Sequence, residues 1–327
     1  MIGEDGVLVQ LIRLVERIPT PASPQRRPRG RPVVYSERLF LKALVIMIVR
    51  RLHKVHELLA VLDEPTHEIR AVRELLKEDG RFPCRRTFER RLKAVPEKLA
   101  DQIGCLGCHL VELLKPWAKC GRAVAIDSTP LRASGGVWHK KDKKSGKVPH
   151  TSIDTEAGWT KSGWHGWVYG WKLHLAVCVG EVWIPLAARL TPADVADNQA
   201  APALIEELPE EVRFVLGDTH YDAENVREKC EQTKRFLVTS KRGAYPHTDS
   251  GVEVRRIFHK LRSLANENFN EHFKTIFDVH GQVPTKGRVN TMRFALGAVF
   301  VYQLALLHRH ERRLDINRGL KPFLRAA

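Results

Sequence analysis

The chain has 327 residues, of which 43% are hydrophobic and 28% charged, and its formal net charge is +16. A chain of this length and composition can bury a substantial core, so it is typical of a soluble globular protein with about two domains. The excess of Lys and Arg favours a polyanionic partner, because each neutralised phosphate releases condensed counterions. Basicity that serves solubility alone is the alternative, since net charge fixes neither a fold nor a ligand.

Export and membrane insertion are not expected. The first residues include Glu4 and Asp5 and lack both a basic leader and a small-residue cleavage site, unlike a secretory signal. The longest apolar run, 294–307, is shorter than a bilayer requires and predicts a buried helix. Six cysteines are few for this length and fit a reducing cytoplasm without disulfides.

One cysteine cluster has the spacing of a cofactor site. The letters CLGCH, Cys105 to His109, match covalent haem attachment and could begin a zinc site with Cys120. Haem attachment of that kind needs an exported chain, and a closed zinc site needs a second tight ligand pair. We therefore expect small apolar cysteines packed on a helix.

The N-terminal segment is predicted to be a basic arm. From Thr20 it reads TPASPQRRPRGRPVVYS, whose prolines prevent a regular helix. Within it PRGRP resembles an AT-hook core, in which Arg29 and Arg31 would lie in a narrow minor groove. A disordered tether that contacts phosphates without reading sequence is the alternative.

A helical region follows the arm. Ser36 is a plausible N-cap for a long apolar-periodic stretch, and further helices are expected near 68–77, 87–93 and 96–117. The short helix in CRRTFERRLKAV follows a tight turn, as a recognition helix entering a DNA groove does. Its candidate DNA contacts are Arg85, Arg86 and Arg90. A packed helix with a solvated basic face is equally compatible with this pattern.

From Gly121 the periodicity changes from helix to strand. The letters RAVAIDSTPLRA predict a strand, and YGWKLHLAVCV and EVWIPLAARL predict a hairpin after a polar insert. Helix and strand then alternate through RFVLGDTHYD to RFLVTS. This order predicts an α/β fold, an RNase H-like mixed sheet flanked by helices and preceded by a smaller all-α N-terminal domain.

Three acidic residues occupy informative places in this order. Asp127 and Asp218 end apolar strands, and Glu267 lies on the helix-like stretch ENFNEHFK. Carboxylates so placed can converge to hold divalent metals, which indicates phosphodiester chemistry on nucleic acid. One such residue alone would more often form a turn or a cap. The remaining aspartates near loop signals are expected to have that structural role: Asp194, Asp197 and Asp222.

Together these motifs resemble a DDE transposase of a bacterial insertion sequence, of the type of insertion-sequence family four. The likeness rests on AIDST, YGWKLHL, LTPADVADN, VLGDTHYD and the six-residue gap between Glu267 and Lys274, and it covers roughly 121–310. It implies that Asp127, Asp218 and Glu267 bind two Mg²⁺ ions, for which Mn²⁺ can substitute. It also implies that Lys274 places a positive charge beside a phosphate.

The helix that carries Glu267 departs from the family pattern. The family has an arginine four positions before the glutamate, where this chain has Ser263, and Arg262 lies one step earlier. One step turns a helical side chain by about 100°, which leaves the role of Arg262, a candidate phosphate contact, open. Glu271 is an alternative ligand because it shares a helix face with Glu267.

A polar insert after the first strand interleaves tryptophans with lysines, a pattern that holds unpaired bases in single-stranded DNA. Its tryptophans are Trp138, Trp159, Trp164 and Trp167. Packing of these rings beneath a long hairpin explains the pattern equally well. Lys172, in YGWKLHL, is a candidate phosphate contact or a snorkelling strand residue.

The sequence therefore predicts a cytoplasmic, nucleoid-associated bacterial transposase that binds double-stranded DNA at element ends and target sites, as a homodimer. It has no expected membrane partner. A non-catalytic DNA-binding regulator and a host RNase H-like nuclease are the alternatives. We expect a basic arm over 1–35 and a helical DNA-binding domain over 36–118. An RNase H-like catalytic domain over 119–310 and a basic tail over 311–327 are expected to follow.

Overall fold

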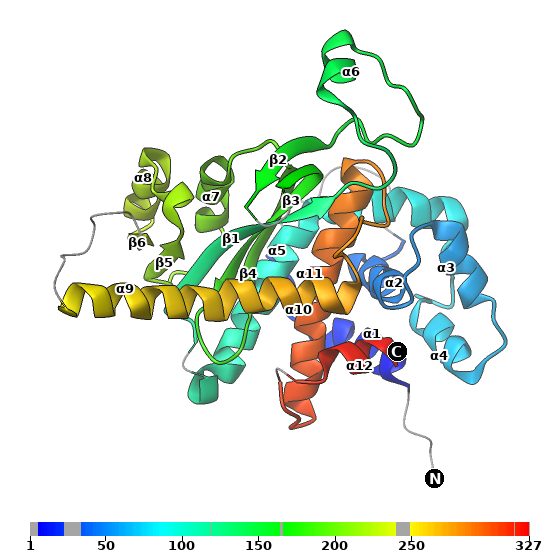
Figure 1. Cartoon of the computed structure of the whole chain (residues 1–327). Helices are drawn as coiled ribbons and strands as arrows, with labels where there is room; N and C mark the ends of the chain where they lie inside the picture. Colours follow the sequence, from blue (N-terminus) through cyan, green and yellow to red (C-terminus); the bar gives the residue numbers. More distant parts are fainter. Residues whose placement is uncertain are drawn as a thin grey trace. The chain divides into compact units, whose positions relative to one another are not determined.

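The computed structural model describes residues 6–22, 34–118, 120–163, 166–239, 249–316 and 318–326. The chain forms two compact units, Met1–Leu106 with Met292–Ala327, and Gly107–Thr291. Figure 1 shows their helices and strands in sequence colours. Compactness does not assign a role to a segment, so the functional domain bounds expected from the sequence stay predictions.

The first unit is helical. Its elements are α1 (Val7–Arg17), α2 (Glu37–Val49), α3 (Val55–Leu62), α4 (His67–Leu75), the first part of α5 (Arg85–Ala118), most of α11 (Arg288–Glu311) and α12 (Leu320–Arg325). The Ser36 hydroxyl accepts a hydrogen bond from the Leu39 amide at 3.3 Å, so Ser36 caps α2 as expected. Gly297 allows α11 to approach α2, since an added Cβ would lie 3.1 Å from Leu44 and 3.2 Å from Ile48.

Helix α5 differs from the sequence expectation. We expected a short helix over 87–93 and a separate one over 96–117, but the structure has one helix of 34 residues with Pro96 inside it. Proline removes one backbone hydrogen bond and normally ends or kinks a helix. Apolar side chains on both sides of it are buried in a continuous stripe, which favours continuation: Phe88, Leu92, Leu99, Ile103 and Leu106.

Helix α11 contains the long apolar run. By length and composition it is the one helix among the described residues that could cross a membrane, yet 83% of its apolar window is buried inside the protein. A buried core helix can meet the same length and composition criteria. The sequence expectation of a buried helix over 294–307 is confirmed by the burial of its apolar side chains.

The second unit is built on a six-stranded sheet. Its strands are β1 (Ala123–Arg132), β2 (Gly158–Ser162), β3 (Gly166–Cys178), β4 (Pro185–Pro192), β5 (Phe214–Gly217) and β6 (Phe236–Thr239). The order is β2-β3-β1-β5-β6, and β4 pairs with the second part of β3. β1, β3 and β4 are antiparallel neighbours, whereas β1, β5 and β6 are parallel. This confirms the expected RNase H-like mixed sheet.

Helices flank this sheet. They are α7 (Asp197–Glu206), η1 (Thr219–Tyr221), α8 (Glu224–Gln232), α9 (Asp249–Arg262), the π-helical turn η2 (Ser263–Glu267) and α10 (Asn268–Phe277). The short helix α6 (Lys140–Ser145) lies in the insert that projects away from the sheet (Figure 1). α9, η2 and α10 form one continuous rod, and η2 contacts β1 and β3 (Figure 1). α7 packs on β3 and β4.

The middle of β1 carries two polar residues, Asp127 and Ser128, that lie next to each other in sequence. Successive residues of a strand point to opposite faces. Asp127 accordingly accepts a hydrogen bond from Asn270 of α10, while Ser128 donates one to Asp197 of α7. The fold therefore places a carboxylate of β1 beside the rod and a hydroxyl of β1 beside α7.

Candidate active site

Parallel pairing of β1 with β5 brings Asp127 and Asp218 together. The register joins Ala125 to Leu216, and each aspartate lies two residues further along its chain. The two carboxylates therefore sit at the same level of neighbouring strands. Gly217 lets the ring of Tyr221 pack against the backbone here, because an added Cβ would lie 2.8 Å from the Cβ of Tyr221.

Asp127 is held in an environment that disfavours its charge. Burial raises the pKa of Asp127 to about 7, and the nearby carboxylates of Asp218 and Asp197 act in the same direction. The guanidinium of Arg262 acts in the opposite direction and lowers this pKa. Asn270 donates to Asp127 Oδ2 at 3.4 Å. A buried carboxylate beside other carboxylates is a group that a cation would stabilise.

Asp218 caps a short turn. Its Oδ1 accepts a hydrogen bond from the His220 amide at 2.8 Å, and its Oδ2 lies 3.1 Å from His220 Nδ1. The turn role that a strand-end aspartate commonly has is therefore present at this position. It coexists with the electrostatic effect of Asp218 on Asp127.

Glu267 points elsewhere. Its side chain is 58% exposed, and its Oε1 lies 3.3 Å from Nη2 of Arg262. Among the described residues, no three His, Cys, Asp or Glu side chains are grouped closely enough to hold one metal ion. Glu271 is also exposed, with Oε1 3.5 Å from His280 Nε2. The structure thus brings the two aspartates together without either glutamate, and the choice between Glu267 and Glu271 as ligand stays open.

The π-helical turn explains the unusual spacing of Arg262. In a π-helix the residue five positions on lies one turn away, whereas in an α-helix it is the residue four positions on. η2 spans Ser263–Glu267, and Arg262 pairs with Glu267 across five positions. The extra residue relative to the family spacing is absorbed by this turn, so Arg262 reaches Glu267 and also influences Asp127.

The two candidate phosphate-binding lysines have different surroundings. Lys274 of α10 is half-buried; burial lowers its pKa, while Glu271 and Asp127 raise it. Lys172 of β3 is 12% exposed, and its Nζ lies 2.9 Å from Asp197 Oδ1 and 3.1 Å from the Val195 carbonyl oxygen. Lys172 is therefore engaged within the protein, and a phosphate contact by it stays a prediction.

Asp197 is the site residue that sequence reasoning missed. We expected a turn or cap, but the N-cap of α7 is Ala196, and the Asp197 carboxylate accepts from Ser128 Oγ and Lys172 Nζ, both at 2.9 Å. Neighbouring His174 is fully buried, and burial lowers its pKa to about 4, so it is neutral. The signal was available in the letters LTPADVADN, whose last aspartate begins α7, the helix packed on the strand with Lys172.

The predicted DNA contacts outside the sheet are arginines of α5 and of the N-terminal arm. Arg85, Arg86 and Arg90 are exposed at the start of α5, and Arg85 pairs with Glu89 at 2.8 Å. Arg29 and Arg31 lie outside the described residues. DNA binding by these arginines stays a prediction.

The tryptophans of the insert divide into two groups. Trp138 and Trp159 donate their indole N–H groups to the carbonyl oxygens of Lys147 and Trp138, which indicates internal packing. Trp167 is 55% exposed, and Lys140 Nζ lies 4.3 Å from its ring centroid. Trp164 lies outside the described residues. Among the tryptophans of this insert that the structure describes, Trp167 is thus the exposed ring.

The aspartate pair fits a divalent cation. Hard oxygen donors suit Mg²⁺ and Mn²⁺, and the burial that raises the pKa of Asp127 to about 7 disfavours its charge unless a cation lies nearby. Arg262 supplies part of that charge. The Cys105 and Cys108 cluster, in contrast, joins no metal-binding group among the described residues.

We predict that Asp127→Asn stabilises the metal-free protein at pH 8. The folded-state pKa of about 7 lies above the ordinary value of 3.8, so the folded chain binds the proton more tightly and loses stability as pH rises between these values. The uncharged amide of the variant should raise the free energy of unfolding by up to ~4 kcal/mol at pH 8 and by little at pH 4. Urea unfolding in EDTA at both pH values measures this. Asp222→Asn, which removes an ion pair with Arg227, is the destabilised comparison. If Asp127→Asn unfolded as easily as Asp222→Asn at pH 8, the prediction would be contradicted.

Comparison with known proteins assigns the family. The family described as "Transposase DDE domain" matches residues 118–295, and no curated protein matches the chain. Among solved structures, the chain is similar to the piggyBac transposase in a synaptic complex with hairpin DNA, at 10% identity and a TM-score of 0.38, covering 98% of this chain and 75% of that one. It is also similar to the pre-cleavage Mos1 transpososome, at 12% identity and a TM-score of 0.20, covering 86% and 80%. These likenesses carry no argument about activity. The family match spans more than half of the chain and includes both aspartates and Glu267, and the chain therefore belongs to the transposase DDE domain family and is a DNA transposase.

Proposed function

We propose that this transposase is encoded by a bacterial insertion sequence of the family-four type, and that Asp127, Asp218 and Glu267 hold two Mg²⁺ ions. The observation that carries the proposal is the alignment of Asp127 and Asp218 on parallel strands, where burial raises the pKa of Asp127 to about 7. Members of the family use divalent metal ions. When bound, these ions supply Lewis acidity at the attacking and leaving oxygens, and Mn²⁺ can replace Mg²⁺.

The reaction has two phosphodiester steps. In cleavage, water forms a new P–O bond and the bond from phosphorus to the 3′ oxygen breaks, so the strand end leaves as a 3′-hydroxyl. In joining, that hydroxyl attacks a target phosphodiester, and the displaced strand leaves through its own 3′ oxygen. Lys274 lies close enough to Asp127 for their charges to interact, and it contributes a fixed positive charge to both steps.

Arg262 and Glu267 give the site a resting arrangement. Arg262 is 16% exposed and lies within electrostatic range of Asp127 while it pairs with Glu267. We propose that metal binding draws Glu267 from this pair toward the aspartates. The cost is modest because Glu267 is exposed and its ion pair with Arg262 is weakly stabilising in water.

The DNA partners follow from the charge and the reaction. Double-stranded element ends would bind the basic N-terminal helices, including the start of α5, and target DNA would reach the face with the aspartates. Two ends must be held together for insertion, so we propose a homodimer on DNA. The bacterial cytoplasm, where the nucleoid lies, is the proposed location.

We predict that Asp127→Asn abolishes cleavage while it leaves end binding intact. Labelled duplexes that carry the inverted repeat bordering the coding region would be incubated with protein and Mg²⁺; the loss should be at least about 10³-fold. Cleavage by this variant at the normal rate would refute the site. Absence of cleavage by the wild type would favour the regulator, and cutting without joining would favour the host nuclease.

Glu267 and Glu271 form a matched pair for testing the third ligand. Glu267→Gln should lower Mn²⁺ affinity, measured by calorimetric titration, about 10-fold or more, whereas Glu271→Gln should change it little. Both side chains are exposed on the same rod, so the two variants share any general effect of charge. A larger loss of Mn²⁺ affinity in Glu271→Gln than in Glu267→Gln would make Glu271 the third ligand.

The π-turn offers a test of helix register. Deletion of Ser263 would give a regular α-helix with Arg262 and Glu267 four residues apart, so cleavage should stay within about tenfold of wild type. Deletion of Asn268 also shortens the rod by one residue, but it turns Glu267 by about 100° relative to Lys274. It should therefore abolish cleavage. Equal activity of the two deletions would show that the turn has no positioning role.

A further inference from the structure

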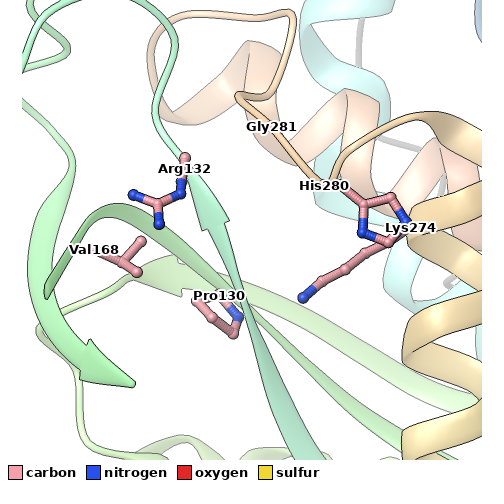
Figure 2. Close-up of a pocket in the computed structure, with 6 residues that line it drawn as sticks. All are labelled: Pro130, Arg132, Val168, Lys274, His280 and Gly281. Atoms are coloured by element: carbon pink, nitrogen blue, oxygen red, sulfur yellow. The ribbon is translucent and has the colours of Figure 1, made fainter. Parts of the chain in front are cut away.

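A small basic pocket lies at the end of β1. It is lined by Pro130, Arg132, Val168, Lys274, His280 and Gly281, and its volume is about 20 Å³. Figure 2 shows the Lys274 ammonium group extending from α10 toward β1, with the Arg132 guanidinium at the end of the strand. The space suits about one water molecule or one oxygen of a bound group. Two cations from distant parts of the chain thus line one pocket.

No protein partner within the described part of the chain neutralises these two cations at close range. Among the described residues, neither the Arg132 nor the Lys274 side chain has a hydrogen bond or an ion pair, whereas Lys172 pairs with Asp197 and Arg262 with Glu267. Burial of an ammonium group without a partner is costly. The nearby carboxylates of Asp127 and Glu271 act on Lys274 only through space. The pocket therefore has positive charge that is available to an anion.

The backbone fixes the shape of this pocket. The Val283 amide donates to the Arg132 carbonyl oxygen at 2.8 Å, and the Gln282 side chain bonds both the amide and the carbonyl of Gly135, at 3.3 and 3.2 Å. Helix α10 ends at Asp278, which adopts a left-handed conformation with φ 54°. The loop with His280 and Gly281 is thus tied to the end of β1. These bonds use the Arg132 carbonyl and the Gln282 side chain, so a side-chain substitution at Arg132 would remove none of them.

His280 has a different role in this pocket. Its Nε2 lies 3.1 Å from Thr275 Oγ1 and 3.5 Å from Glu271 Oε1, so it is partnered. It forms a wall and is not a free cation. The anion ligands of the pocket are therefore Arg132 and Lys274.

We propose that Arg132 and Lys274 together bind one backbone phosphate of the DNA strand that passes the aspartates. Arg132 can offer two parallel N–H groups to a phosphate, and Lys274 adds a point charge. Arg132 is five residues beyond Asp127 on β1, which corresponds to about 17 Å. The phosphate should therefore lie within about five base-pair steps of the one that is cut. This inference rests on the proposed active site.

Substitution of single phosphates tests the proposal. A set of duplexes with the bordering inverted repeat would each carry one neutral methylphosphonate near the cleavage point, and binding would be measured in Ca²⁺ without cleavage. Wild-type affinity should fall about tenfold at one position within the predicted distance. Arg132→Gln should lose that sensitivity, and Arg132→Lys should keep part of it. Arg122→Gln, an exposed arginine at the other end of β1, should match wild type.

The outcomes separate this inference from the proposed function. If Arg132→Gln were as sensitive as wild type to a methylphosphonate at every position of the duplex, the pocket assignment would be overturned. This holds even if Asp127→Asn abolished cleavage as expected. Selective loss at one position would support it, even if the metal ligands proved to be different residues. Unchanged thermal unfolding of Arg132→Gln and Arg132→Lys would confirm that both variants retain the fold.

Discussion

The parallel pairing of β1 with β5 is the constraint on which the site depends. It sets two carboxylates side by side on neighbouring strands, and burial then makes the charge of Asp127 unfavourable without a cation. The pairing belongs to the sheet itself, so the aspartates are positioned by many backbone hydrogen bonds. A site carried by strands in this way is held more precisely than one carried by loops.

The rod formed by α9, η2 and α10, in contrast to the regular strands, contains an irregular turn. Its π-helical turn lies at the junction of α9 and α10 and ends at Glu267, the residue whose position relative to the aspartates matters most. π-turns are rare and often occur at functional sites, because one extra residue redirects the side chains beyond it. The sheet therefore fixes the two aspartates that we propose as ligands, whereas the rod sets the direction of Glu267, the proposed third ligand.

Sequence reasoning predicted five of the six described strands, because an apolar run and a turn mark each of them. It missed β2, whose residues Gly158–Ser162 lie within the polar insert and form no apolar run. It also predicted Asp218 directly after a strand, since a strand end is visible from local composition. It expected Asp127 at a strand end as well, but Asp127 lies in the middle of β1, which continues to Arg132. It did not predict the unbroken α5, where burial of residues on both sides of Pro96 outweighs the local cost of proline. It also missed the π-turn, because whether the extra residue at Ser263 rotates the helix or bulges from it depends on contacts with β1 and β3.

Asp197 shows why a residue's role cannot be read from its local signals. Its carboxylate joins Ser128 and Lys172, which are 44 residues apart in sequence and adjacent only through the pairing of β1 with β3. Lys172 neutralises Asp197 at close range, yet the Asp197 charge still raises the pKa of Asp127. The same carboxylate therefore anchors α7 to the sheet and increases the demand of the neighbouring site for positive charge. Structural and electrostatic roles coincide in this residue because both follow from its burial beside β1.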